Sequence, residues 1–224
     1  MTATGADRRP VGGIPLGGCS LAERPWALLG EEGGRGIDAD WFAALPHRGA
    51  PRWVVPVSDN VNSRIGLELY APAKLLGKAR KLLLQLRLQW PRLLLRDALI
   101  PIRHDGVRQL WGDVFAAAGL PIDLRLFISV GTPGPTQKVT VLLVDPAGQR
   151  RAIMKLAVEP QAEERVRHEA QMLRFMAGRM PGKVVPALLG EFETSFGWVA
   201  VQSVVPTRGV GNKLTGRHWQ LLSS

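Results

Sequence analysis

Apolar and polar residues alternate in the C-terminal half of the chain. Aliphatic residues occupy the even positions from Leu124 to Val130, with Arg, Phe and Ser between them. This period of two predicts a half-buried β-strand. Further strands are predicted over residues 138–144 and 150–158, separated by Asp145-Pro146-Ala147-Gly148, an order typical of a tight turn. The three strands are expected to form a meander.

A helix and two more strands are predicted after the meander. The helix covers residues 160–177, because Pro160 suits the first helical turn and two glutamates follow near the positive end of the helix dipole. Gly178 suits the closing position. Strands are predicted near residues 184–189 and 197–205. This half is expected to be α+β, with a five-stranded antiparallel sheet and one helix.

The strongest helical pattern extends over residues 72–100, where Pro91 predicts a kink or two abutting helices. A further helix is predicted from Gly106 to Ala118, ending at Gly119. Polar and apolar side chains of the first helix recur at steps of three and four, which separates them onto two faces. The basic face contains Lys74, Lys78, Lys81, Gln85, Gln89, Arg92 and Arg96, and the apolar face contains Leu75, Leu76, Ala79, Leu82, Leu83, Leu86, Trp90, Leu93 and Leu94.

Shorter elements are predicted upstream. Residues 53–57 and 65–70 are expected to pair as a hairpin, with Pro56 at a sheet edge or bulge. Residues 38–45 are expected to form one helical turn. Residues 1–36 are rich in Gly, Pro and Arg and are expected to be mostly disordered.

Four segments follow from these patterns. They are a mostly disordered segment (1–50), a hairpin with a basic amphipathic helical extension (51–119), the five-stranded unit (120–206) and a short remainder (207–224).

Positive charge is concentrated in one part of the chain. The formal net charge is +10, and residues 51–104 carry ten basic and three acidic side chains. Such a local excess indicates an anionic partner. A membrane surface is one such partner, because the helix also has a leucine face. Packing of the leucine face against the rest of the protein, with the basic face in water, is the favoured alternative.

Several classes of protein are not expected. The single Cys19 has no partner for an internal disulfide, which suits a reducing cytoplasm. We expect no membrane-spanning segment and no secretory signal, and place the protein in the cytoplasm, with a peripheral position at the inner face of the membrane as the alternative. The four histidines are scattered, so no zinc site is expected. Aromatic residues do not interleave the charges, so nucleic acid is not expected as a partner.

Lys155 and Glu169 are the main candidate site residues. Lys155 lies in a predicted strand, and Glu169 follows fourteen positions later in the predicted helix. A lysine on a strand, held by a glutamate on the next helix, is how protein-kinase-like folds bind the phosphates of ATP. The plain alternative is that Lys155 is a solvated strand residue and Glu169 one of several acids on the helix.

The order of three meander strands, one helix and two strands resembles the small N-terminal lobe of protein-kinase-like enzymes. With Gly131-Thr132-Pro133-Gly134-Pro135 and Ala152-Ile153-Met154-Lys155, residues 120–220 look like aminoglycoside-phosphotransferase-like kinases. They are similar in particular to kinase-like proteins found with bacterial exopolysaccharide genes. The resemblance implies ATP as the cofactor, a phosphate-covering loop and a hinge that binds adenine. The implied binding residues are Lys155, Glu169, Gly131, Thr132, Gly134, Ser203 and Val205.

The chain also departs from that family. No Asp or Glu follows Glu193, so the catalytic Asp and the metal-binding Asp of the large lobe cannot be placed. Residues 207–224 would be the start of a truncated large lobe. We expect a nucleotide-binding chain that is not catalytically competent as printed, with Mg²⁺ bound only if a partner chain supplies a large lobe. The alternative is a non-catalytic interaction module that engages a membrane surface or a polysaccharide-assembly partner through its basic helix.

Overall fold

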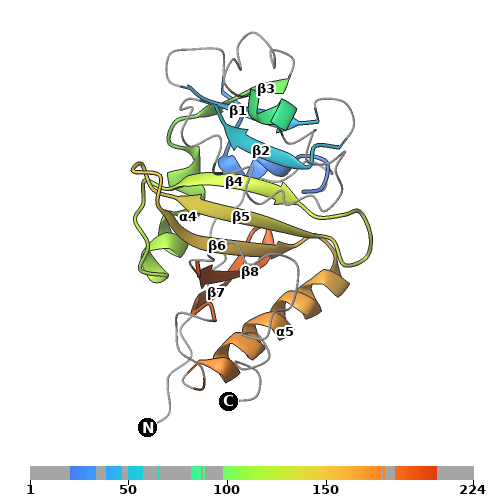
Figure 1. The fold of residues 1–224 in the computed structure, drawn as a ribbon, viewed down its shortest axis with the longest axis vertical. Coiled ribbons are helices and arrows are strands. Elements are labelled where there is room, and N and C mark those ends of the chain that lie inside the picture. The colour runs from blue at the N-terminus through green and yellow to red at the C-terminus, as the bar shows by residue number, and fades with distance from the viewer. Residues whose placement is uncertain are drawn as a thin grey trace.

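The computed structural model has an α+β fold built on one open antiparallel sheet of eight strands (Figure 1). It describes residues 21–33, 39–46, 50–57, 65, 82–86, 88, 98–177, 179 and 185–205. The strand order is β3-β1-β2-β4-β5-β6-β8-β7. The elements are the 3₁₀ helix η1 (Pro25–Leu29), β1 (Ala39–Leu45), β2 (Trp53–Pro56), β3 (Leu99–Arg103), α4 (Gly106–Ala117), β4 (Arg125–Val130), β5 (Lys138–Val144), β6 (Arg150–Ala157), α5 (Pro160–Met176), β7 (Leu188–Thr194) and β8 (Gly197–Ser203).

The C-terminal strands follow the predicted order. Strands β4, β5 and β6 form the predicted meander, and β8 lies between β6 and β7 because α5 connects β6 to the outer strand β7. In the turn before β6, Asp145 accepts a hydrogen bond from the amide of Gln149 (2.8 Å), and Gly148 has a positive φ of 80°. Strand β7 begins at Leu188, four residues later than predicted near residue 184.

The main core lies on the face of the sheet that packs against α4 and η1. Trp111 and Phe115 of α4 are fully buried there together with Leu28 of η1. The indole Nε1 of Trp111 donates a hydrogen bond to the carbonyl oxygen of Leu28 (2.7 Å). This bond satisfies the one polar group of a large buried side chain and joins the N-terminal segment to α4.

The opposite face carries two smaller cores. One packs α5 against β8, with Val166 and Ala170 of the helix against Trp198 and Ala200. The other covers β1, β2, β4 and β5 and includes Leu88, with Leu84 packed against it. Ile153 of β6 also packs against this second cluster.

Three upstream predictions are wrong. The sheet has eight strands and not five, because β1, β2 and β3 continue it beyond β4. Residues 39–45 form β1 and not a helical turn, since they pair with β2 on one side and β3 on the other. The predicted hairpin partner of residues 53–57 is not the observed one: β2 has β1 and β4 as its two neighbours, and Ile65 is helical, while residues 66–70 lie outside the described residues.

The same pairing corrects the position of Pro56. Strand β2 is interior, and Pro56 is its last residue, beyond Trp53 and Val54, which pair with β4. The ring is therefore tolerated at a strand end and not at a sheet edge.

Part of the segment expected to be disordered is folded. Residues 21–33 include η1, and both Leu28 and Leu29 are fully buried. Their burial against α4 and the sheet supplies the apolar contact that the local sequence does not reveal.

The predicted faces of the basic helix also need correction where the structure describes them. Leu82, Leu83 and Leu86, assigned to a packed apolar face, are exposed by 59%, 57% and 48%. Leu84 and Leu88 face the core instead. Most of residues 72–97, the remainder 207–224 and residues 1–20 lie outside the described residues.

Candidate functional site

Lys155 lies near the C-terminal end of β6, on the sheet face that packs against α5. Its neighbours Met154 and Leu156 point into the main core, so alternation places Lys155 on the opposite face. The Lys155 Nζ donates a hydrogen bond to Oε1 of Glu169, which projects from the middle of α5. The lysine side chain is only 13% exposed. The predicted contact between these two side chains is confirmed.

Lys138 is a second cation at this contact. It lies two residues before Thr140, the direct neighbour of Lys155 across the β5–β6 ladder, and therefore on the same face. Its Nζ is 3.3 Å from Oε2 of Glu169. Lys138 was not among the residues predicted from the sequence, although alternation along two paired strands is a signal that can place it on the face of Lys155. Two ammonium groups thus contact one carboxylate, which leaves a local excess of one positive charge.

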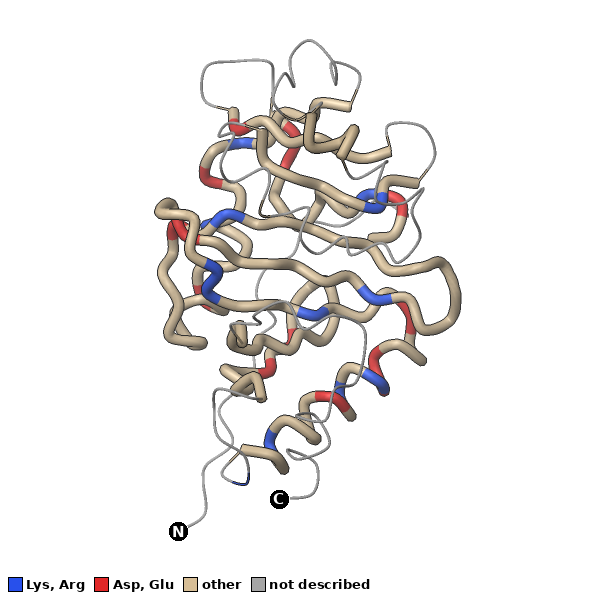
Figure 2. Tube along the Cα trace, in the orientation of Figure 1, with Lys and Arg blue, Asp and Glu red and all other residues tan. Residues whose placement is uncertain are grey.

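Glu169 is ionised across the neutral pH range. Partial burial acts to raise its pKa, but the hydrogen bond and charge of Lys155 and the charge of Lys138 outweigh burial, so the pKa lies below its ordinary value of 4.5. The helix carrying it alternates acidic and basic residues along its length (Figure 2). Glu163 and Arg167 form one such pair at 2.7 Å, and the Arg167 guanidinium also lies over the Trp198 ring. These neighbouring contacts fix α5 on the sheet and so fix the position of Glu169.

Gln202 continues the polar side chains across the sheet. On β8, Ala200 is opposite Lys155 and Gln202 is opposite Ile153, so Gln202 shares their face. We call Lys138, Lys155 and Gln202 the polar diagonal, since they lie on β5, β6 and β8 with each step shifted by two residues. Gln202 is only 7% exposed, and its side chain forms no hydrogen bond with any of the described residues.

The predicted phosphate loop lies between β4 and β5 and projects beyond the end of these strands (Figure 1). A Cβ on Gly131 would lie 2.9 Å from the Lys138 carbonyl oxygen, so this glycine is required by close backbone packing. Gly134 has a positive φ of 149° and open space around it. The hydroxyl of Thr132 accepts a long hydrogen bond from Arg52 (3.4 Å). Both glycines are therefore explained by the backbone of the loop itself. The loop ends at the residue before Lys138, the first residue of β5.

The predicted hinge residues follow Gln202. The Ser203 amide donates to the Ala187 carbonyl oxygen (2.8 Å), and the Ser203 hydroxyl oxygen accepts from the Ala187 amide (2.8 Å). The Ser203 amide hydrogen and its hydroxyl oxygen are therefore both engaged by Ala187. Val205 is partly buried, and Val204 packs against the cluster that contains Leu84 and Leu88.

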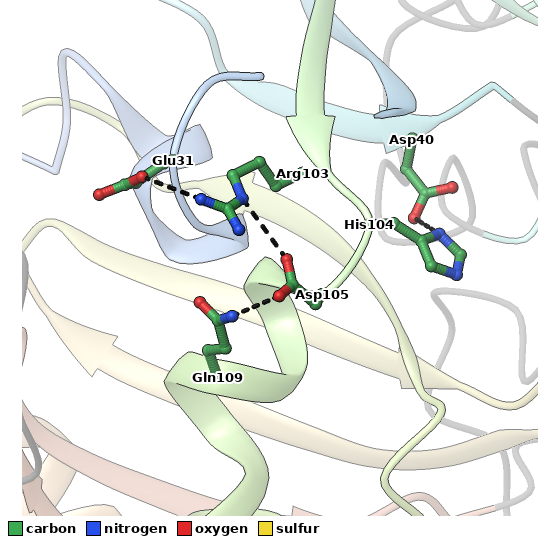
Figure 3. Close-up of polar contacts among 6 residues, drawn as sticks. All are labelled: Glu31, Asp40, Arg103, His104, Asp105 and Gln109. Atoms are coloured by element: carbon green, nitrogen blue, oxygen red, sulfur yellow. Dashed lines mark hydrogen bonds and ion pairs between the residues drawn. The ribbon is translucent and has the colours of Figure 1, made fainter. Parts of the chain in front are cut away.

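A separate polar region lies near the other edge of the sheet, between β1, β3 and the start of α4 (Figure 3). Here a cavity of about 370 Å³ is lined by polar and apolar side chains and contains none of the predicted site residues. The Nδ1 of His104 lies 2.9 Å from an oxygen of Asp40, yet His104 is 79% exposed. Arg103 forms long ion pairs with Glu31 (3.8 Å) and Asp105 (3.6 Å), and Asp105 accepts a hydrogen bond from Gln109.

Among the described residues, no group of three or more His, Cys, Asp and Glu side chains is arranged to hold a metal ion. In the same part of the chain no helix combines the length and the apolar character needed to cross a bilayer.

Comparison of the chain with protein-family models, with curated proteins and with solved structures gave no match.

Proposed function

We propose that the polar diagonal binds the phosphates of a nucleotide, with ATP as the first candidate, in a small lobe of the kinase-like phosphotransferase type. The observation that carries the proposal is the contact of Lys155 with Glu169. A strand fixes the lysine at its base and a helix fixes the glutamate, so the ammonium group is ordered before any ligand arrives. An ordered cation loses little conformational freedom on binding an anion, which favours affinity.

The charge balance also supports an anionic ligand. Lys138 and Lys155 share the single carboxylate of Glu169, and the Lys138 and Glu169 side chains remain 42% and 37% exposed. A phosphate can therefore approach from the solvent side and accept charge-assisted hydrogen bonds from both ammonium groups. Glu169 would hold Lys155 in position and would not itself contact the phosphates.

The order of elements supports the kinase-like part of the proposal. Three meander strands are followed by α5, then by a hairpin whose second strand pairs with the lysine-bearing β6. Phosphoryl transfer also depends on groups that position a metal and a nucleophile. We therefore propose nucleotide binding by these residues, with phosphoryl transfer dependent on further groups for the metal and the nucleophile.

Thermal unfolding with millimolar ATP tests the proposal. A ligand present at about 100 times its Kd raises the free energy of unfolding by about 2.7 kcal/mol, which shifts Tm by roughly 5–10 °C for a chain of this size. We expect such an upward shift for the wild type and its loss in Lys155→Met, which keeps the stem of the side chain and removes the ammonium group.

Arg103→Gln is the matched control, because it removes one cation from β3 at the opposite edge of the sheet. The control is expected to keep the full ATP-dependent shift. An equal shift in the wild type and Lys155→Met would refute the assignment of phosphate binding to Lys155. No shift in the wild type would refute nucleotide binding as a whole.

A second candidate function is docking on an anionic membrane surface. It is favoured by Leu82, Leu83 and Leu86, which are exposed and spaced to share one side of a helix. In the sequence they lie within the 51–104 segment and its ten basic residues. Exposed leucines beside a cationic segment suit an interface of anionic lipid, where both kinds of side chain find partners.

Sedimentation with vesicles of phosphatidylcholine containing about one third phosphatidylglycerol tests this candidate. Leu83→Gln combined with Leu86→Gln should reduce pelleting several-fold, whereas Ile122→Gln, at another exposed apolar residue, should not. Equal pelleting of the wild type and the double variant would remove the leucine side chains from membrane binding.

A further inference from the structure

Gln202 combines deep burial with a side chain that forms no hydrogen bond to any residue the structure describes. A buried carboxamide offers two donor hydrogens and an oxygen acceptor, and leaving these groups without partners costs stability. Among the described residues, the other two buried polar side chains, Gln137 and Asp145, each have a partner: Gln137 donates to the Gly131 carbonyl oxygen (3.2 Å), and Asp145 binds the Arg151 guanidinium and the Gln149 amide. Gln202 therefore differs from every comparable side chain in the described part of the chain.

The neighbouring strands of Gln202 explain why it has no hydrogen-bond partner among the described residues. Ile153 lies directly opposite on β6, and Leu188 lies opposite on β7. Ile153 and Val204 belong to the apolar packing of the neighbouring cluster. The two diagonal neighbours of Gln202 on β6 are both held by carboxylates: Lys155 by Glu169 and Arg151 by Asp145.

We propose that Gln202 recognises the edge of the nucleobase in a nucleotide whose phosphates bind Lys155 and Lys138. The inference rests on the proposed nucleotide-binding function and adds a residue that determines base recognition. Diagonal neighbours in a sheet lie roughly 7–8 Å apart, so the Lys155 and Gln202 side chains are close enough to contact different parts of one nucleotide. The polar diagonal would then bind the phosphates at its lysine end and the base at its glutamine end.

The chemistry of a carboxamide suits a base edge. Purine bases present a donor and an acceptor side by side, and a glutamine side chain pairs with both at once. Rotation of the carboxamide exchanges its donor and acceptor, so the same residue accepts an adenine or a guanine edge. The apolar side chains of Ile153 and Val204 suit the flat faces of the ring, because ligand sites combine apolar walls with few oriented polar groups.

Titration calorimetry with ATP, GTP and inorganic triphosphate tests the inference. We compare the wild type with Gln202→Met, which preserves side-chain length, and with Gln109→Met, the same change at an exposed site on α4. We expect Gln202→Met to bind ATP and GTP about tenfold more weakly and triphosphate with unchanged affinity. Gln109→Met should bind all three probes as the wild type does.

The ligand-free Tm provides a second readout. Gln202→Met should melt no lower than the wild type, because the substitution removes an unpaired buried amide. A lower Tm would overturn the inference, since it would mean that the carboxamide already has partners in the free protein.

The outcomes separate the two proposals. Unchanged ATP and GTP affinity in Gln202→Met would overturn base recognition and leave phosphate binding intact. Equal weakening of ATP, GTP and triphosphate would also overturn it, because the effect would then be on the phosphate end. Absence of binding of all three probes to the wild type would overturn both proposals.

Discussion

The Lys155 site and the His104 region are two polar sites that differ in the burial of their charged side chains. At the first, a strand and a helix bring together a nearly buried lysine, a second lysine and a carboxylate with a lowered pKa. At the second, a cavity of about 370 Å³ is bordered by a His–Asp pair whose histidine is 79% exposed. This cavity and the ordered charges of the Lys155 site therefore lie in different parts of the molecule. Ordering and desolvation strengthen the electrostatic effect of a charge, so we propose the first site as the functional one.

The largest predicted effect is that of Glu169→Gln. The substitution leaves the Lys155 ammonium, 13% exposed, without its anionic partner, at an expected cost of about 2 kcal/mol in the free energy of unfolding. This figure is set below that of a fully buried pair because Glu169 is itself 37% exposed. Denaturant unfolding measures the change. Glu163→Gln is the control on the same helix, and a cost there as large as at Glu169 would show that the two ion pairs are equivalent.

A second, smaller predicted effect is the pH dependence of the stability that Glu169 contributes. The pKa of Glu169 is lower in the folded chain than its ordinary value of 4.5, so its stabilising contribution is complete above that value and is lost as the pH falls through the folded pKa. The stability difference between the wild type and Glu169→Gln should therefore be constant at neutral pH and narrow below about pH 4.5. Urea unfolding at a series of pH values measures it. A difference that stays constant into strong acid would contradict the ionised pair.

The smallest effect is expected at the other site. His104→Ala breaks the contact with Asp40, but both side chains are well exposed, so the free energy of unfolding should change by less than about 0.5 kcal/mol. The ATP-dependent Tm shift should also remain. Loss of the ATP-dependent Tm shift in His104→Ala would contradict the choice of the Lys155 site and would favour the cavity beside His104 as the nucleotide site.

Local patterns predicted the C-terminal elements well and the N-terminal ones poorly. The bounds of β5 match the prediction because residues 138–144 sit between clear turn signals and pair with their neighbours in sequence. The spacing of Lys155 and Glu169 predicted their contact for the same reason, since β6 and α5 are consecutive elements. Short-range pattern and final structure agree where the partners are close in sequence.

The failures share a physical cause in long-range pairing. Trp41, Phe42 and Leu45 have a spacing that also fits a helix, but β1 is held between β2 and β3, and the latter lies more than fifty residues away along the chain. Tertiary contacts of this kind override local propensity. Gln202 was missed because its significance depends on burial without a partner, which becomes visible only when the neighbouring strands and their side chains are placed.

The pairing of β2 with β4 limits how the molecule can be divided. A fragment starting after α4 would keep Lys155, Glu169 and Gln202, but it would lose β2 from one border of the remaining strands and Trp111 from their apolar side. Without β2, β4 would become an exposed edge strand, and its unpaired backbone amides and carbonyls could pair with a strand of another chain. Such an excised fragment should self-associate, so the phosphate and base assays belong on the intact protein.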